Sequence, residues 1–434
     1  MLKLLFNRRH RNCEGTSRRD FLRVGALGLC GLNLADLLAA RALAAHDGRP
    51  TRNTSVVWLW LNGGPTHIET FDPKMTAPSE FRSVTGEVKT TLPGVTLGSH
   101  FSRVAQVADK MAFVRSFAHD HNGHNNAAFW MMSGYPRDKK RPSMGSVTAK
   151  VRGPNHRVTG MPTYVGMGRI GFNQDAPQIP GPKWLGQAYA PFNPDGQTRT
   201  NMKLTCEVER LEDRRSLLTN LDRLCRDCDA RGVMDGIDAF DRQAVNLILG
   251  EAPHAFDLKR EDPRVVEKYG GGLGAQMLLA RRLCEAGCGF VTVSYQGWDM
   301  HGNVKRGMDR RGPDVDRAVA TFVEDIYERG LDENIVLVVT GEFGRTPRIN
   351  KRGGRDHWCQ LSTLALSGGG LEMGQAIGES SPRAEVPQSN RVSPQDLMAT
   401  LFHVLGIDPS IQLYDPSGRP LTLVETGKPI VELV

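Results

Sequence analysis

Short apolar runs alternate along the chain with segments that carry apolar residues at helical spacing. Apolar runs bounded by turn residues are typical of buried parallel strands. Alternation of such strands with helices predicts an α/β protein, an α/β/α sandwich with helices on both faces of a mostly parallel central sheet. The predicted strands are Ser55–Leu61, Met111–Arg115, Phe290–Tyr295, Ile335–Thr340 and Ser362–Leu366, and the predicted helices are Asn125–Met132, Leu273–Glu285, Pro313–Arg329 and Pro394–Val404.

Polar residues follow directly after four of these strands. Residues 62–72, 119–126, 297–303 and 341–345 combine Gly and Asn with His, Asp, Glu and Arg. Ligands of parallel α/β sheets bind outside the carboxyl ends of the strands. We therefore expect these four segments to converge on one site.

The middle of the chain has a different texture. Residues 152–206 are rich in Gly, Pro, Asn and Gln, and residues 208–262 are rich in helix-forming residues. Long irregular segments in compact domains are usually functional. We predict an irregular cap loop over the site, followed by a helical insertion, together spanning about 152–262.

The N-terminal segment has the pattern of an export signal. Residues 17–22 read Ser-Arg-Arg-Asp-Phe-Leu, a mildly apolar stretch follows to Leu38, and residues 42–44 offer a small-x-small cleavage site. This predicts a twin-arginine signal peptide over 1–44 and one domain over 45–434. The expected location is the periplasm or the exterior, and the expected export partner is the twin-arginine machinery. No later stretch approaches the roughly 18 apolar residues of a membrane-spanning helix, so we expect no integral membrane segment in the mature chain.

Charge argues against a nucleic-acid partner. The chain carries a net charge of +7. Residues 1–44 hold eight basic and three acidic side chains and so contribute +5, which leaves +2 for the remainder. A balance this small gives no electrostatic reason to expect a polyanion such as nucleic acid.

Six cysteines follow the signal, and disulfides are possible in an oxidising compartment. Cys225 and Cys228 form a C-x-x-C pair, but no strand precedes it and no second pair matches it, so we expect no redox or zinc motif there. Cys284 and Cys288 lie one helical turn apart and are predicted to belong to the core.

The histidines and carboxylates at the strand ends are candidate metal ligands. Imidazole and carboxylate together suit zinc, manganese or iron without a thiolate. Asp299 and His301 lie on one side of an extended segment, which suits a shared ion. For Arg345 and Arg355 two roles stay open, binding of an anionic substrate group or salt bridges to Glu342 and Asp356. The histidines in these segments are His67, His119, His121, His124, His301 and His357.

Residues 62–74, 297–303, 341–347 and 353–358 resemble the domain-of-unknown-function 1501 family over nearly the whole mature chain. That family is similar in turn to the alkaline phosphatase and sulfatase superfamily. The resemblance implies an alkaline-phosphatase-like fold with one or two divalent ions at the strand ends, and hydrolysis of phosphate or sulfate esters. It implies zinc, calcium or manganese as the cofactor and an ester of a small molecule or polysaccharide as the substrate.

Carried over by position, Asp299 and His301 resemble the Asp and His of one metal, and His357 resembles a late histidine ligand. Glu342 falls at the Asp of the second metal. Residues 121–134 resemble the nucleophile loop and its helix, and His124 falls near the nucleophile position.

The chain also departs from the superfamily pattern. Phe343 replaces a metal-binding His, the nucleophile loop lacks Ser, Thr and Cys, and Asn62 replaces an Asp for which Asp72 or His67 can substitute. We expect a metal-dependent hydrolase of sulfate or phosphate esters, and the alternative is a carbohydrate- or partner-binding protein on a degenerate hydrolase fold. The predicted metal ligands are Asp299, His301, His357, Glu342, His67 and His121, and the predicted catalytic residues are Glu342, His124 and Arg345.

Overall fold

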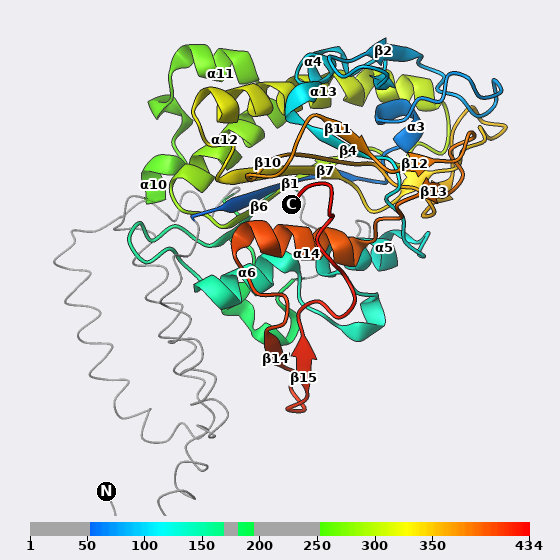
Figure 1. Ribbon diagram of the computed structural model, residues 1–434. Helices are drawn as coiled ribbons and strands as arrows, with labels where there is room; N and C mark the ends of the chain where they lie inside the picture. Colours follow the sequence, from blue (N-terminus) through cyan, green and yellow to red (C-terminus); the bar gives the residue numbers. More distant parts are fainter. Residues whose placement is uncertain (1–52, 169–180, 195–251) are drawn as a thin grey trace, which may run out of the picture. The chain divides into compact units, whose positions relative to one another are not determined.

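The computed structural model describes residues 53–168, 181–194 and 252–434, all of which belong to one compact unit. Its centre is a seven-stranded sheet with the strand order β11-β4-β10-β7-β1-β6-β5 (Figure 1). β10 runs antiparallel to both of its neighbours, and the other pairs are parallel. The strands are β1 Ser55–Asn62, β4 Ala112–Val114, β5 Tyr164–Met167, β6 Phe290–Gln296, β7 Ile335–Thr340, β10 Leu364–Gly368 and β11 Gln375–Ile377.

β1 lies inside the sheet between β7 and β6, and every one of its residues is buried. Val57, Leu59 and Leu61 belong to the core on one face of the sheet. Val56, Trp58 and Trp60 belong to the core on the other face. A strand that is apolar on both faces needs cover on both faces, which is the condition that a parallel α/β sheet meets.

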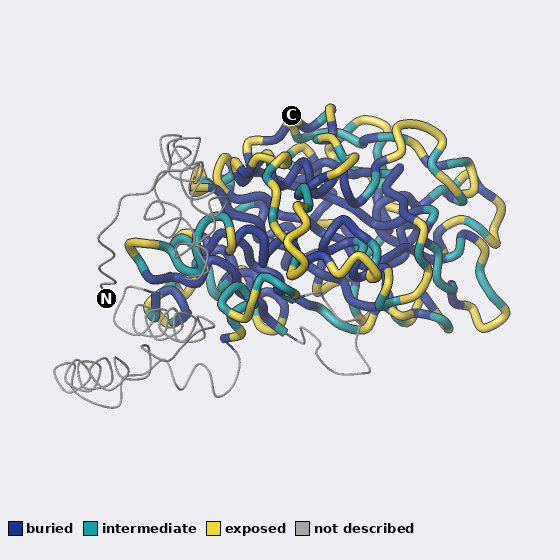
Figure 2. Tube along the Cα trace, turned by 90° about the horizontal axis from the view of Figure 1, so that it is seen from below, coloured by how far each residue is buried: buried dark blue, intermediate teal, exposed yellow. Residues whose placement is uncertain are grey.

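Helices supply that cover (Figure 1). α12 and α13 lie on one face together with α4, α10 and α11, while α5, α6 and α14 lie on the other. Figure 2 shows buried stretches through the middle of the trace and exposed stretches among its outer segments. The helices are α4 Ser102–Gln106, α5 His124–Ser133, α6 Met144–Arg152, α10 Ala252–Ala255, α11 Pro263–Tyr269, α12 Leu273–Glu285, α13 Val304–Glu328 and α14 Pro394–Leu405.

Smaller elements surround this sandwich. They are the short helix α3 His67–Thr70 and the strand pairs β2 Glu87–Lys89 with β3 Thr96–Gly98, β8 Gly344–Arg345 with β9 His357–Trp358, β12 Glu379–Ser380 with β13 Pro387–Ser389, and β14 Gln412–Tyr414 with β15 Pro420–Thr422. Single 3-10 turns lie at Ala108–Lys110, Arg137–Lys139, Lys183–Leu185, Gln187–Tyr189 and Leu258–Arg260.

The predicted α/β class and mostly parallel sheet are confirmed, with two corrections to single strands. Ser362–Leu366 was expected to form a parallel strand, but β10 is antiparallel, because a short connection from β9 returns it beside β7. Tyr164–Met167 lies in the segment expected to be an irregular cap, yet it pairs in parallel with β6 at the edge of the sheet. Both differences follow from strand pairing, which local composition does not specify.

α13 begins nine residues before the predicted start at Pro313. Proline is common in the first turn of a helix and therefore predicts a start there. In the structure Asn303 caps the helix by accepting from the Arg306 N–H, and Val304 and Met308 bury the first turns. Tertiary packing thus overrides the local signal of the proline.

The predictions about the export signal, the cysteines and the cap fall partly outside the described residues. The expected export signal over 1–44, the pair Cys225 and Cys228, and most of the proposed cap and insertion lie outside the described residues. Cys284 and Cys288 are buried and free, as expected for core residues. No helix among the described residues combines the length and apolar composition needed to cross a bilayer.

Candidate metal centre

The strands bring the polar segments together at one edge of the sheet. β1, β6 and β7 are mutually parallel, and two antiparallel pairings through β10 give β4 the same direction. Asp299 follows β6, Glu342 follows β7, and His124 opens α5 after β4. The predicted convergence of strand ends is therefore present.

Gly63 allows two of these loops to approach each other. Its φ is +116°, a backbone conformation that side chains disfavour, and a Cβ there would lie 2.4 Å from the backbone nitrogen of Asp299. The N–H of Trp298 donates to the carbonyl of Asn62 across this contact. The tight turn after β1 thus fixes the loop that carries Asp299.

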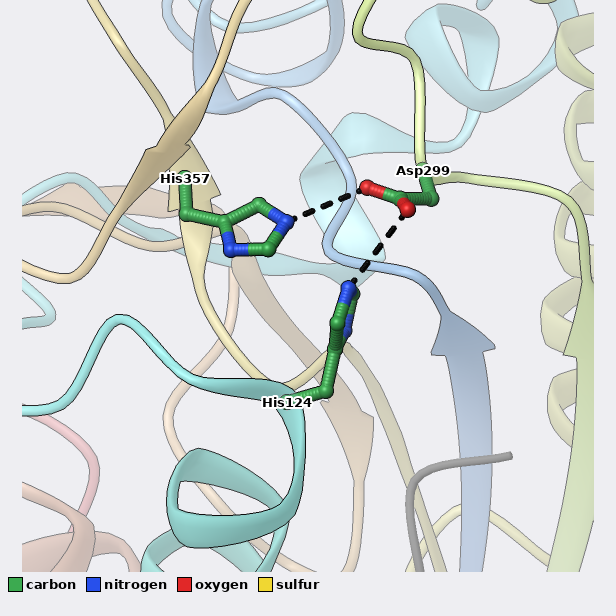
Figure 3. Close-up of side chains that lie close together, drawn as sticks. All are labelled: His124, Asp299 and His357. Carbon is green, nitrogen blue, oxygen red and sulfur yellow. Dashed lines mark hydrogen bonds and ion pairs between the residues drawn. The ribbon is translucent and has the colours of Figure 1, made fainter. Parts of the chain in front are cut away.

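Three imidazoles lie close to the carboxylate of Asp299, and Figure 3 shows two of them, those of His124 and His357. Nε2 of His301 and Nε2 of His357 lie 3.0 Å and 3.2 Å from Asp299 Oδ1. Nε2 of His124 lies 3.5 Å from Asp299 Oδ2. We call these four residues the histidine–aspartate cluster.

The other nitrogen of each imidazole is held by a separate acceptor. Nδ1 of His124 lies 2.7 Å from Glu342 Oε1, and Nδ1 of His301 lies 2.7 Å from Asp356 Oδ1. Nδ1 of His357 lies 2.8 Å from the carbonyl oxygen of Asn122. In a neutral imidazole, an acceptor at Nδ1 favours a proton on that nitrogen and leaves a lone pair on Nε2, the nitrogen nearer Asp299, for an ion to use.

This arrangement fits a divalent ion. His124, Asp299 and His357 offer ligand atoms that all lie within 4.8 Å of one another. Nε2 of His301 and Nε2 of His357 are only 3.0 Å apart, a distance at which the two nitrogens can share at most one proton. Metal-bound histidines usually donate their second N–H to a carboxylate or carbonyl, as all three do here.

The charges in the cluster shift two pKa values. Burial acts to lower the pKa of His124, but hydrogen bonds and charges from Asp299 and Glu342 outweigh it and raise that pKa to about 9. Burial acts to raise the pKa of Asp299, yet hydrogen bonds from His124, His357 and Arg345 hold it far below its usual range. Without an ion, His124 therefore carries a proton at neutral pH, which an ion would displace.

Glu342 lies behind the cluster. Its carboxylate is fully buried, and Oε1 accepts from the Gly63 N–H at 2.9 Å besides contacting His124. Its Oε2 has no hydrogen-bond partner among the described residues. The structure therefore places Glu342 as the residue that orients His124, while its predicted roles as ligand or base stay predictions.

Arg345 does not face an incoming anion. Its side chain is fully buried, and it donates to the carbonyls of Gly63, Gly64 and Arg355 and to Asp299 Oδ1 at 2.6 Å. Every nitrogen of the guanidinium is thus engaged within the protein. This placement makes Arg345 the residue that anchors Asp299, in place of the expected grip on a substrate.

Arg355 is engaged elsewhere. It forms an ion pair with Glu69 at 3.1 Å, and both side chains are fully buried. Neither of the partners proposed from sequence, Glu342 and Asp356, pairs with it in the described structure. Arg355 is therefore structural, and Asp356 is free to hold His301.

Two of the predicted ligands lie apart from the cluster. Nε2 of His67 contacts the carbonyl of Ala384 at 3.1 Å, and burial lowers the pKa of His67 to about 4. The ring of His121 lies against Trp130, with ring centroids 6.0 Å apart. Within the described residues, no hydrogen bond or ion pair joins either ring to the cluster.

Phe343 lies at the position where the sequence resemblance implies a metal-binding histidine. Its buried ring lies 4.4 Å from the ring of His357 and 5.0 Å from that of His124, measured between centroids. It therefore packs beneath both imidazoles instead of binding an ion beside them. Among the described residues, one group of side chains could hold an ion, and it consists of His124, Asp299 and His357.

Sequence reasoning missed the acceptors behind the ligands. Asp356 was considered only as a salt-bridge partner, and the carbonyl of Asn122 carries no side-chain signal at all. Asn350 donates to both oxygens of Asp356 and so holds it in place. Only the spacing of Asp356 next to His357 hinted at a role in this site.

No protein of curated function matches the sequence. Similar solved structures include a sulfatase from Pseudoalteromonas sp., at 12% identity and a TM-score of 0.37, covering 85% of this chain and 70% of that one. An alkaline phosphatase from the Antarctic bacterium TAB5 has 12% identity and a TM-score of 0.37 over 82% of this chain and 99% of that one. A phosphonate monoester hydrolase from Silicibacter pomeroyi has 9% identity and a TM-score of 0.36 over 82% and 74%.

A family model describes almost all of the chain beyond its N-terminal segment. The match runs from residue 53 to residue 434, which includes every residue of the histidine–aspartate cluster. The family resemblance stated from the sequence motifs is thereby confirmed. The chain belongs to the DUF1501 family of proteins of unknown function.

Proposed function

We propose that this protein is a metal-dependent hydrolase of sulfate or phosphate esters. The observation that carries the proposal is the geometry of the three imidazoles. Each has Nδ1 held by an acceptor and Nε2 turned toward the half-exposed carboxylate of Asp299. A set of ligands that is oriented from behind and open in front is typical of a catalytic metal centre.

His124, Asp299, His301 and His357 would hold the ion. When bound, a divalent ion polarises an ester oxygen and lowers the pKa of coordinated water. The residues of the chain orient these ligands: Glu342 holds His124, Asp356 holds His301 and Arg345 holds Asp299. Imidazole and carboxylate ligands favour zinc or manganese over calcium, which prefers oxygen.

The proposed attacking group is water. Among the described residues, no serine, threonine or cysteine side chain hydrogen bonds to the four cluster residues. Cys359 follows His357 closely, but its thiol is buried and burial raises its pKa, so the thiolate is disfavoured. Hydrolysis through a covalent hydroxyl ester therefore has no support in this site.

The decisive experiment measures metal content and ester hydrolysis on the same protein. Mass spectrometry of the exported protein is compared with an Asp299→Ala, His301→Ala double variant and with His403→Ala, which changes an exposed histidine of α14. We expect stoichiometric metal in the wild type and in His403→Ala, and none in the double variant. A panel of sulfate and phosphate esters should then be turned over only by the metal-loaded proteins.

Two outcomes would count against the proposal. Absence of any divalent metal, and no uptake at micromolar concentration, would exclude a metal enzyme. Stoichiometric metal with no turnover of any ester would favour the alternative, a binding protein on a hydrolase fold. In either case circular dichroism of the double variant shows whether the fold survived.

We also propose that the chain works in the periplasm or outside the cell. The support is the Ser-Arg-Arg-Asp-Phe-Leu motif of residues 17–22 and the apolar stretch after it. An Arg18→Lys, Arg19→Lys double variant should remain in the cytoplasm with its leader uncleaved, as measured by cell fractionation. Unchanged export of that variant would contradict the proposal.

A further inference from the structure

A concave region lies at the other end of α5 from the histidine–aspartate cluster. It has a volume of about 1000 Å³ and lies between the turn after α5, the 3-10 turn at Lys183–Leu185 and the turn that joins β14 to β15. None of the residues that line it belongs to the cluster. We call this region the basic hollow, and its basic residues are Arg137, Lys139, Lys140, Arg141, Lys183 and Arg419.

Positive charge is concentrated in this region. Six basic side chains face three acidic ones there, whereas residues 45–434 as a whole carry a net charge of only about +2. Arg141 pairs with Glu425, and Arg419 pairs with Asp415 at 3.1 Å. Within the described part of the chain, the remaining four cations have no carboxylate partner.

Aromatic side chains accompany these cations. Trp184 and Phe129 line the hollow. The ammonium of Lys183 lies 4.4 Å from the centroid of the Phe129 ring, and the guanidinium of Arg137 lies 5.8 Å from it. Phe129 is buried beneath these cations, while Trp184 is partly exposed. The hollow thus offers both positive charge and a flat apolar surface.

Two of the lysines have strained backbones. Lys140 and Lys183 have φ angles of 49° and 51°, in the left-handed region that lysine seldom adopts. Residues held in that region cluster at binding sites, where the surrounding structure fixes them. Lys74 has a similar φ of 48° but does not line the hollow, so two of the three described lysines in this backbone region belong to it.

We propose that the basic hollow binds an anionic oligosaccharide, a chain of sugar rings that carries carboxylate or sulfate groups. The cations match several anionic groups along such a chain, and the partly exposed indole of Trp184 matches the apolar face of a sugar ring. A volume of about 1000 Å³ lies at the upper end of ligand sites and exceeds the needs of a single small anion. The proposal goes beyond ester hydrolysis, because binding here requires neither metal nor turnover.

Other polyanions fit less well. Nucleic acid needs a broad basic surface that follows its backbone, but the part of residues 45–434 outside this hollow is nearly balanced in charge, at about −1. An anionic membrane favours basic residues without acidic neighbours and with apolar side chains that insert. This region is concave, and its Phe129 ring is buried beneath Arg137 and Lys183, where it cannot insert into a membrane.

The test is binding of defined oligosaccharides to the exported protein. Isothermal titration calorimetry compares an oligogalacturonate, a heparin-derived oligosaccharide and a neutral cello-oligosaccharide, so that the carboxylate and sulfate sources are distinguished. We expect one of the anionic ligands to bind, and to bind more weakly as salt is raised. The neutral ligand should not bind.

Two variants locate the binding. An Arg137→Gln, Lys139→Gln, Lys140→Gln triple variant changes exposed residues only and should weaken binding by about tenfold or more. An Arg157→Gln, Lys259→Gln, Arg260→Gln variant makes the same change in charge at exposed sites elsewhere and should bind as the wild type does. A Trp184→Ala variant should also weaken binding.

Several results would overturn the proposal. No binding of either anionic ligand at low salt would do so, as would equal losses in both triple variants. Tighter binding of single-stranded DNA or of phosphatidylglycerol vesicles than of any oligosaccharide would assign the hollow to another partner. Retained binding in the metal-free Asp299→Ala, His301→Ala variant is expected, so failure here is distinct from failure of the proposed hydrolase function.

Discussion

Two groups of polar side chains lie close together in this protein, and they differ in how completely their hydrogen-bonding atoms find partners within the protein. In the pair of Arg355 and Glu69, both side chains are fully buried and every donor and acceptor has a protein partner. In the histidine–aspartate cluster, Asp299 keeps 45% of its side chain exposed and three imidazole nitrogens crowd around it. The two clusters draw on the same strand-end segments of the sequence.

The difference separates a structural ion pair from the proposed metal centre. Arg355 donates to four backbone carbonyls besides Glu69, so an added ligand would have to break existing hydrogen bonds. In the cluster around Asp299, by contrast, the Nε2 atoms of three imidazoles share one carboxylate, and those of His301 and His357 lie only 3.0 Å apart. An ion bound among these nitrogens would give each of them a partner. Residue type alone does not reveal this difference. The exposure of the side chains and their unsatisfied hydrogen-bonding groups do.

The largest expected effect on stability comes from breaking the buried ion pair of Arg355 and Glu69. A Glu69→Gln variant leaves the Arg355 cation buried without a counterion, which should reduce the free energy of unfolding by about 3–5 kcal/mol. Denaturant-induced unfolding measures this. A Glu379→Gln control, at an exposed position, should change it by less than about 0.5 kcal/mol. Equal stability of the two variants would show that the pair contributes nothing.

Acid should destabilise the folded protein through the buried imidazole of His67. Burial lowers the pKa of His67 to about 4, below its ordinary value of 6.5, so the unfolded chain takes up a proton that the folded chain refuses. Unfolding free energy should therefore fall as the pH drops from about 6.5 to 4, by up to about 3 kcal/mol from this residue. A His67→Gln variant should show a shallower dependence over the same range. An unchanged slope would mean that the His67 pKa is not lowered.

The histidine–aspartate cluster should bind metal more weakly when the carboxylate of Asp299 is changed. An Asp299→Asn variant keeps the shape of the side chain but removes the charge, which should weaken metal binding at least about a hundredfold. In the metal-free protein the pKa of His124 should fall from about 9, because its anionic partner is gone. Competition with a chelator measures the affinity, and NMR titration of the imidazole measures the pKa. Wild-type affinity in this variant would remove Asp299 from the ligand set.

The smallest effect is expected behind the ligands. An Asp356→Asn variant should still bind the metal, but with about tenfold lower affinity, because His301 loses the acceptor that fixes its Nδ1 proton. The same chelator competition reports this loss, and the exposed Glu379→Gln variant serves again as the control. A loss as large as that of Asp299→Asn would make Asp356 a ligand itself.

The apolar runs of the sequence determined the sheet and the layers over it. Strands such as Ser55–Leu61 were predictable because a segment buried on both faces must be apolar at every position, and this demand is local. The placement of His124, Asp299 and His357 near one another followed from the direction of the parallel strands. Family membership followed from the long motifs after those strands.

Only the tertiary structure decided which polar residues do what. Arg345 and Arg355 have the same side chain and similar sequence surroundings, yet one anchors Asp299 and the other neutralises Glu69. The antiparallel direction of β10, the pairing of β5 and the early start of α13 depend on contacts between distant segments. Sequence composition specifies which residues are buried, but hydrogen-bond partners are chosen in three dimensions, where small differences in position decide which acceptor each donor can reach.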